Sequence, residues 1–202
     1  MAMQLFKRFG VPNVKLTINT LGDKQVREDY REALINFLKP HYDELSSDSQ
    51  ERMYRNPLRV LDSKDAGDQK IVAQAPSILD YLDEESQNYF DQVQSLLREL
   101  GIDYEIDTNM VRGLDYYNHT IFEIMSDSPV FGGGYTTVCA GGRYNGLISQ
   151  LGGPEEGGIG FGMGVERLML LLQEENPEFA PQDQLDVFFA SADQQGDEMA
   201  FE

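Results

Sequence analysis

The chain has 202 residues, of which 41% are hydrophobic, so it can bury a sizeable core as one domain or as one domain with part of another. Its formal net charge of -19 argues, on composition alone, against a nucleic-acid-binding protein, because a polyanion would be repelled. No apolar run approaches the roughly 18 residues of a membrane span, and Lys7 and Arg8 interrupt any secretory signal, so we expect a cytoplasmic protein with no membrane partner.

Helices are expected over most of the first hundred residues. The first nine residues resemble the last turns of a helix that ends at Gly10, with no N-cap residue ahead of them. Alternating apolar residues predict a strand over 13–21, and apolar residues at helical spacing predict a helix that follows it. Three helices are predicted after this strand, over residues 23–45, 46–57 and 83–101. Pro57 is expected to end the second helix, and Gly101 is the C-terminal signal of the third.

After Gly101 the hydrophobic period changes from that of a helix to that of a strand. Short β-branched and aromatic runs predict antiparallel strands, two of them joined by a hairpin over 126–134. These strands are expected at 103–107, 119–125 and 135–141. The elements expected next are a helix over 143–153, a glycine-rich strand over 157–164, a helix over 165–175, a linker over 177–184, a strand over 185–192 and a helix to residue 202. The sequence therefore predicts an α+β fold in which residues 103–164 form an antiparallel sheet against the helix with Leu168 and Leu171.

The stretch "GGIGFGMGVERLMLLLQ", residues 157–173, predicts an anion site. It does not fit G-x-G-x-x-G, and the chain has no Gly-Lys dipeptide for a Walker A loop, so two common nucleotide folds are disfavoured. Arg167 is the single base after Glu155 and lies in the first turn of a helix, where a guanidinium and helix N–H groups can both meet phosphate. The alternative is that the glycines only permit close packing and that Arg167 pairs with Glu166 or another acid.

Two further stretches combine arginine, tyrosine and glycine. In "MVRGLDYYNHTIFE", residues 110–123, Arg112, Asp115 and two tyrosines are close enough in sequence to contact one small polar ligand. Its alternative is a hairpin with a local ion pair between Arg112 and Asp115. "AGGRYNGL", residues 140–147, again joins a cation and a ring, Arg143 and Tyr144, although a glycine turn before a helix would explain it too.

Other groups suggest no site. The single cysteine, Cys139, excludes an internal disulfide and is expected to be a small buried residue. The two histidines, His41 and His119, lie far apart and leave no zinc-ligand spacing, so no protein-bound metal site is predicted.

The segments "VRGLDYY", "AGGRYNGL" and "GFGMGVERL", in this order, resemble the two histidine-specific motifs and the third class II motif of histidyl-tRNA synthetases. The segment "RMYRNPLRVLDSKD", residues 52–65, resembles part of the domain that bacterial members carry inside the catalytic core. The resemblance covers nearly the whole chain. It implies a mainly helical inserted domain at 1–100, the C-terminal half of a class II catalytic core at 101–176, and a linker with the start of an α/β anticodon-binding domain at 177–202.

The resemblance also implies an activity and roles for particular residues. The reaction is ATP-dependent activation of histidine to histidyl-adenylate, with Mg²⁺ accompanying ATP, followed by transfer to tRNA(His) in a homodimeric enzyme. Arg112 is the expected catalytic residue, which stabilises charge between the histidine carboxylate and the α-phosphate instead of a general base. The histidine pocket is expected to comprise Arg112, Tyr116, Tyr117 and Tyr144. The ATP site is expected to comprise Arg167, Gly160, Gly162 and Gly164, and Arg143 is a weaker structural or pocket candidate.

The first and second class II motifs have no counterpart in the sequence, so we expect an internal piece of a longer enzyme that is inactive alone. Two other classes stay open. One is the non-catalytic, synthetase-like regulatory subunit of ATP phosphoribosyltransferase, against which the near-complete "RGLDYYN" counts. The other is a helical interaction module in which Arg112 and Arg167 are surface residues, and burial of both around one cleft would count against it.

Overall fold

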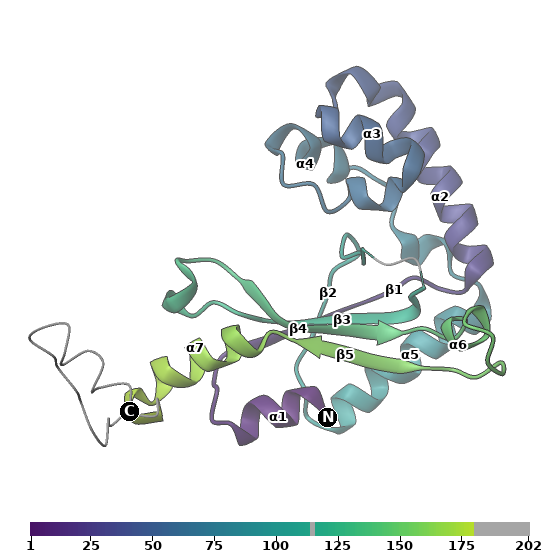
Figure 1. Cartoon of the computed structure of the whole chain (residues 1–202). Helices are drawn as coiled ribbons and strands as arrows, with labels where there is room; N and C mark the ends of the chain where they lie inside the picture. The colour runs from purple at the N-terminus through teal and green to yellow at the C-terminus, as the bar shows by residue number, and fades with distance from the viewer. Residues whose placement is uncertain (114–115, 180–202) are drawn as a thin grey trace, which may run out of the picture.

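The structure of the protein is a computed structural model that describes residues 1–113 and 116–179. Figure 1 shows how its helices and strands are arranged. The α-helices are α1 (Ala2–Arg8), α2 (Lys24–Leu38), α3 (Ser47–Arg55), α4 (Ala66–Val72), α5 (Glu84–Glu99), α6 (Leu147–Gln150) and α7 (Val165–Glu175). The 3-10 helices are η1 (Lys39–Glu44), η2 (Pro57–Val60), η3 (Ile78–Tyr81), η4 (Pro129–Phe131) and η5 (Pro177–Phe179). The strands are β1 (Val14–Thr20), β2 (Glu105–Ile106), β3 (Asn118–Ser126), β4 (Thr136–Arg143) and β5 (Ile159–Met163).

The strands of the described residues form one mixed sheet in the order β2-β1-β3-β4-β5. The pairs β1–β3, β3–β4 and β4–β5 are antiparallel, and the predicted hairpin joins β3 to β4. The prediction that residues 103–164 form an antiparallel sheet needs two corrections. β1, from the first hundred residues, lies between β2 and β3, and β2 runs parallel to β1. The parallel pair is possible because a long helical segment, and not a tight turn, connects β1 to β2.

Helices α1, α5 and α7 lie on one face of the sheet (Figure 1). Phe90 of α5 and Leu168 and Leu171 of α7 pack in one core with Ile124 of β3. Burial of such side chains stabilises the fold by about 1.5–3 kcal/mol each. Cys139 of β4 is buried in the same core, as predicted, and this burial raises the pKa of its thiol to about 11. The expected packing of the sheet against the helix with Leu168 and Leu171 is confirmed.

Residues 24–81, here called the helical module, lie over the opposite face of the sheet (Figure 1). Helix α2 presents Tyr30, Leu34 and Leu38 on one side, because these residues are spaced by about one turn. They pack in one core with Met53 of α3 and with Ile121 of β3. Since Ile121 belongs to the sheet, the core of the helical module continues onto this face of the sheet.

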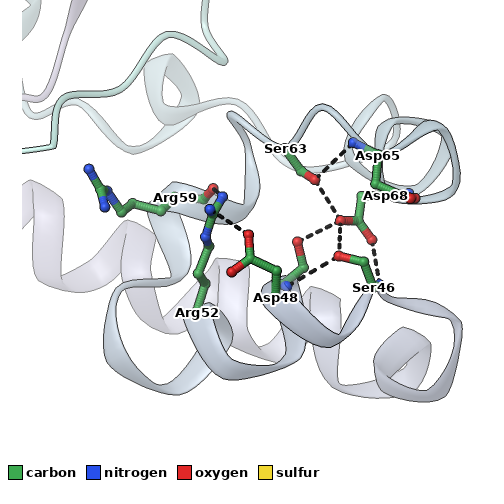
Figure 2. Close-up of polar contacts among 8 residues, drawn as sticks. Ser46, Asp48, Arg52, Arg59, Ser63, Asp65 and Asp68 are labelled. Atoms are coloured by element: carbon green, nitrogen blue, oxygen red, sulfur yellow. Dashed lines mark hydrogen bonds and ion pairs between the residues drawn. The ribbon is translucent and has the colours of Figure 1, made fainter.

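A buried carboxylate, Asp68 of α4, ties the helical module together (Figure 2). Its Oδ1 accepts the backbone N–H of Ser46 at 2.8 Å, and its Oδ2 accepts the hydroxyls of Ser46, Ser49 and Ser63 at 2.7, 2.6 and 2.6 Å. Burial alone would raise the pKa of this carboxyl, but the hydrogen bonds from Ser49, Ser63 and Ser46 outweigh it and lower the pKa to about 2. The start of α3, the segment after η2, and α4 are therefore linked around one negative charge.

The helix ends follow the signals in the sequence. Asp23, Ser46 and Asp83 are the N-caps of α2, α3 and α5, and each accepts a backbone N–H through its side chain. Gly10 and Gly101 follow α1 and α5 with positive φ, as expected of helix C-termini. The strand and helix predicted beyond residue 184 lie outside the described residues. In the part of the chain that the structure describes, no helix has the length and apolarity that a membrane crossing requires.

Two predicted helices are shorter than expected. The helix predicted over 23–45 ends at Leu38 and continues as the 3-10 helix η1, because Pro40 has no N–H for an α-helical hydrogen bond. The helix predicted over 143–153 is reduced to α6, since β4 extends to Arg143 and Gly152 adopts a positive φ.

Candidate functional site

The candidate site lies on the sheet face that α1, α5 and α7 leave uncovered. Directly paired residues of antiparallel strands point to the same face, so the register defines two rows across the sheet. The rows, from β1 to β5, are Thr17, Glu123, Ala140 and Gly162, and Asn19, Ile121, Gly142 and Gly160. Side chains become small toward β5 in both rows. This end of the face is therefore a floor of nearly bare backbone.

Two tyrosines stand on this floor. A Cβ at Gly142 would lie 3.0 Å from Cδ1 of Tyr117, and a Cβ at Gly160 would lie 2.8 Å from the hydroxyl of Tyr144. A Cβ at Gly162 would meet nothing within 4 Å. Glycine is thus needed at 142 and 160 to admit the tyrosines, whereas Gly162 faces open space.

The predicted tyrosines form one cluster. The ring centroids of Tyr116 and Tyr117 are 4.6 Å apart, and that of Tyr144 is 5.8 Å from Tyr116 and 6.3 Å from Tyr117. Both contacts of Tyr144 are edge-to-face, an arrangement that the ring quadrupoles favour. Burial, assisted by the Tyr116 hydroxyl, raises the pKa of Tyr117 to about 12, so its hydroxyl is protonated and can donate a hydrogen bond at neutral pH.

Arg112 lies beside this cluster, fixed by the sheet. Its Nη2 donates to Oε1 of Glu123 at 2.7 Å and to the carbonyl of Phe122 at 3.0 Å. The side chains of Arg112 and Glu123 are only 15% and 20% exposed, so solvent screens this ion pair weakly. The other oxygen of Glu123 accepts the hydroxyl of Thr137 at 2.7 Å. Glu123 therefore holds the guanidinium in one orientation.

Arg167 lies at the other end of the same network. Its Nη1 donates to the carbonyl of Thr137, so Glu123 and Thr137 connect the two arginines. Arg167 is exposed, and it contacts Thr137 rather than Glu166. Gly164, the N-cap of α7, has no side chain to cap the helix, which leaves the first-turn N–H groups of an 11-residue helix available to an anion.

Arg143 is turned toward α5 instead of the floor. Its Nε donates to the hydroxyl of Tyr89, and its Nη1 donates to the side chain of Asn145 at 2.9 Å. Its guanidinium carbon lies 5.3 Å from the centre of the Tyr89 ring. Arg143 thus anchors the strand end that carries Tyr144, in agreement with the structural alternative expected for it.

The remaining polar candidates add no metal centre. Asp115, expected as a local partner of Arg112, lies outside the described residues, and Arg112 pairs with Glu123. Among residues 1–113 and 116–179, no three His, Cys, Asp or Glu side chains are placed to hold a metal ion. The site combines an aromatic cluster, a buried cation, a flat floor and an exposed cation. These features suit a small ring-bearing molecule next to a phosphorylated one.

The fold is that of an aminoacyl-tRNA synthetase core. A solved structure of Staphylococcus aureus histidyl-tRNA synthetase without ligand matches 99% of the chain with a TM-score of 0.69 and 44% sequence identity, and the match covers 48% of that protein. A family model described as histidyl-tRNA synthetase matches residues 8–168, and the chain belongs to this family.

Curated relatives carry the name histidine–tRNA ligase. The protein of Lactiplantibacillus plantarum is 63% identical over 188 residues, which cover 93% of the chain and 44% of the relative. The protein of Lacticaseibacillus casei is 57% identical over 202 residues, which cover 100% of the chain and 46% of the relative. The chain thus spans less than half the length of these relatives.

The two alternatives receive no such support. A Bacillus halodurans structure titled as an ATP phosphoribosyltransferase regulatory subunit/histidyl-tRNA synthetase is similar at 20% identity and a TM-score of 0.50, which shows the fold alone. For the helical interaction module, the burial of Arg112 counts against that class, whereas Arg167 is exposed, so the criterion of two buried arginines is met by one of them.

Sequence reasoning missed Glu123 and Thr137. A signal for Glu123 was present, since it is a charged residue between apolar neighbours in the strand "TIFEIM". A carboxylate in such a run needs a buried partner, and the arginine eleven positions earlier is a candidate for it. Thr137 gave no signal, because a threonine in a strand is ordinary.

Proposed function

We propose that the protein to which this chain belongs is a histidine–tRNA ligase, which uses ATP to convert histidine to histidyl-adenylate and transfers the histidyl group to tRNA(His). The observation that carries this proposal is the position of Arg112. Its guanidinium is held by Glu123, which pairs across the sheet with Ala140 in the row that ends at Gly162, and which is connected to Arg167 through Thr137. Membership in the histidyl-tRNA synthetase family supports it independently.

The tyrosine cluster is the proposed histidine pocket. Tyr116, Tyr117 and Tyr144 present ring faces and edges to a flat heteroaromatic side chain, and their hydroxyls offer hydrogen bonds to imidazole nitrogens. Arg112 lies at the edge of the pocket, where its charge attracts the substrate carboxylate. The pocket thus binds the two ends of histidine by different interactions.

Adenylate formation needs charge stabilisation more than proton transfer. The histidine carboxylate is already ionised at neutral pH, so its oxygen attacks the α-phosphorus without a general base, and pyrophosphate leaves with the bonding electrons. Negative charge develops on the oxygens between the carboxylate and the α-phosphate. Arg112 is the proposed catalytic residue because its guanidinium is fixed by Glu123 before the reaction and need not reorganise.

The glycine floor and the start of α7 are the proposed ATP site. Gly162 faces open space, which suits a flat base, and Gly164 leaves the first turn of α7 open to phosphate. Gly160 supports this floor together with the hydroxyl of Tyr144. Arg167 is exposed and can pair with ground-state phosphates. Mg²⁺ enters with the triphosphate, because in such sites it is held largely by phosphate oxygens and water.

The remaining assignments concern the whole protein. Residues 1–100 are proposed to be mainly an inserted helical domain, although β1 belongs to the sheet; residues 101–176 form the C-terminal half of the catalytic core, and residues 177–202 lead into an anticodon-binding domain. The whole protein is proposed to be a cytoplasmic homodimer. The isolated chain is proposed to be inactive, since it spans 46% of the relative that it matches in full.

The test uses a chimeric enzyme in which the 202 residues replace the aligned segment of the Lacticaseibacillus casei relative. Histidine-dependent exchange of labelled pyrophosphate into ATP is measured on the purified chimera and on the isolated chain, both freed of host synthetase. The proposal expects exchange by the chimera and none by the chain. A folded chimera that shows no exchange would refute the proposed function, and exchange by the chain within about tenfold of the chimera would refute its inactivity.

A further inference from the structure

Residues 110–113 and 116–117 include Arg112 and two of the tyrosines, and the helical module contacts them at two points. The side chain of Arg59 fills the space that a side chain at Gly113 would occupy. The carbonyl of Arg59 is held in turn by Nη1 of Arg52 at 3.4 Å. Figure 2 shows the Arg59 side chain extending away from the serine cluster around Asp68.

The second contact comes from Arg27 of α2. Its Nη1 donates to the carbonyl of Tyr117 at 2.8 Å, across 90 positions of sequence. This is a charge-assisted hydrogen bond to a partly buried acceptor, which is stronger than a neutral one. Tyr117 is the ring that stands over Gly142 and contacts both Tyr116 and Tyr144.

The backbone of Arg27 is itself well fixed. The N-cap Asp23 accepts the N–H of Val26 at 2.8 Å, and Val26 and Tyr30 are buried on either side of Arg27 in sequence. Gly22, with a φ of 61°, packs so closely on Val26 that a side chain there would collide with it. The Arg27 side chain therefore extends from a well-fixed first turn of α2 toward the carbonyl of Tyr117.

We propose that Arg27 is a positioning residue for the candidate histidine pocket, acting through the carbonyl of Tyr117. The inference rests on the proposed function, because it assigns the tyrosine cluster to histidine. The orientation of the Tyr117 peptide sets where its ring leaves the backbone, and hence the ring's place over Gly142. Without the Arg27 hydrogen bond, the start of β3 loses one of its restraints, and the ring is free to shift. A shift of about 1 Å in a positioning group can cost about 100-fold in rate.

The experiment measures pyrophosphate exchange by the chimeric enzyme with Arg27→Ala, Arg27→Lys and the control Arg31→Ala. Arg31 lies one turn further along α2, is exposed, and lines together with Arg27 a cavity of about 310 Å³ that none of the three tyrosines lines. Its removal therefore matches the loss of charge without the loss of the hydrogen bond to Tyr117. Because the hydrogen bond to the Tyr117 carbonyl is lost, Arg27→Ala is expected to raise the KM for histidine about 10-fold and to leave the KM for ATP within about twofold. Arg27→Lys, which keeps one donor, is expected to recover most of this loss.

The KM values for histidine and for ATP distinguish a positioning role of Arg27 from a role in fold stability alone. If Arg27 only stabilised the fold, its loss would lower the fraction of active enzyme and hence kcat, with both KM values unchanged. A KM for histidine in Arg27→Ala within about twofold of Arg31→Ala overturns the inference, and so does an equal rise in both KM values. If Arg27→Ala does not fold, Arg27→Met, which keeps much of the aliphatic chain but has no donor, takes its place and is compared with Arg31→Ala by the same criteria. An unsubstituted chimera without exchange refutes the proposed function itself, and the inference falls with it.

Discussion

Replacing Asp68 by asparagine tests the buried carboxylate that ties the helical module together. Asparagine has nearly the same shape, and its carbonyl oxygen can still accept the N–H of Ser46. Its amide nitrogen cannot accept the hydroxyls of Ser46, Ser49 and Ser63, all of which donate to Oδ2 of the native carboxylate. Three short charge-assisted hydrogen bonds are thus lost or inverted in a site without solvent access.

The size of the effect follows from the pKa of Asp68. A drop from an unfolded value of 3.8 to about 2 corresponds to roughly 2.4 kcal/mol of stabilisation at neutral pH, at about 1.36 kcal/mol per unit. Hydroxyls left without an acceptor add to this, so we expect Asp68→Asn to lower the free energy of unfolding by about 3 kcal/mol at pH 7. Exposed Asp62 on the neighbouring loop is the control, and Asp62→Asn is expected to change the free energy of unfolding by less than about 0.5 kcal/mol.

The effect also depends on pH in a defined direction. Because folding lowers the pKa of Asp68, its ionisation stabilises the native protein above the unfolded pKa near 4, and this contribution is lost as pH falls toward 2. Acidification removes this stabilisation from the native chain, whereas the asparagine variant has no carboxylate at position 68 and does not change in this way. The difference between the two proteins should therefore shrink by about 1.1 kcal/mol from pH 7 to pH 3.

Urea unfolding of the 202-residue chain, followed by circular dichroism at both pH values, measures these differences. A destabilisation below about 1 kcal/mol at pH 7 would mean that the serine hydroxyls find other partners, and that Asp68 does not organise the module. A difference that is the same at pH 7 and pH 3 would show that the carboxylate is not stabilised as an anion.

Three further predictions concern the proposed synthetase site and are measured on the chimeric enzyme. Arg112→Ala should slow adenylate formation by on the order of 100-fold or more in pre-steady-state assays, with little change in ATP binding, because its charge acts mainly as the transition state develops. Arg167→Ala should instead weaken ATP binding itself, by about 10-fold, because Arg167 is proposed to pair with ground-state phosphates. Gly162→Ala should leave the melting temperature within about 2 °C, since the added methyl meets no atom of the protein, but raise the KM for ATP by about 10-fold or more.

Each of these predictions has a contrary result. Small and equal effects of the Arg112 and Arg167 substitutions, under about threefold, would reject both assignments. An unchanged KM for ATP in Gly162→Ala would mean that the nucleotide does not lie on this floor. Gly10→Ala provides a comparison for Gly162→Ala, because Gly10 is also free of close neighbours but lies outside the site, and its φ of 72° makes any strain from the substitution visible as a loss of stability alone.

Local signals predicted much of the fold. Asp23, Ser46 and Asp83 cap helices, and a glycine ends α1 and α5, because these residues act through their immediate neighbours in sequence. The pairing of β1 with β3 and the parallel direction of β2 were not predicted, since strand pairing depends on which distant segments bury each other's faces. A two-residue strand such as β2 carries too little pattern to reveal its direction.

The candidate site was likewise predicted only in part from the sequence. Arg112, Arg167 and the tyrosines could be singled out from the sequence, because cations and rings next to glycines are unusual. Their supports could not be predicted from pattern. Glu123 reaches Arg112 from the next strand, and Arg27 reaches Tyr117 across 90 positions, so both contacts exist only after the chain has folded.

Cys139 gives the protein a practical property. It is the single cysteine of the sequence, it is 1% exposed, and its thiol has a pKa of about 11, so almost none of it is thiolate at neutral pH. The thiolate is the form that reacts with alkylating reagents, so the native chain should stay unlabelled while it is folded. A cysteine introduced at an exposed position, such as Tyr54 of α3, would then be the one thiol that reacts. A fluorophore or spin label could be attached there without first removing any natural cysteine, and could follow the helical module as ligands bind.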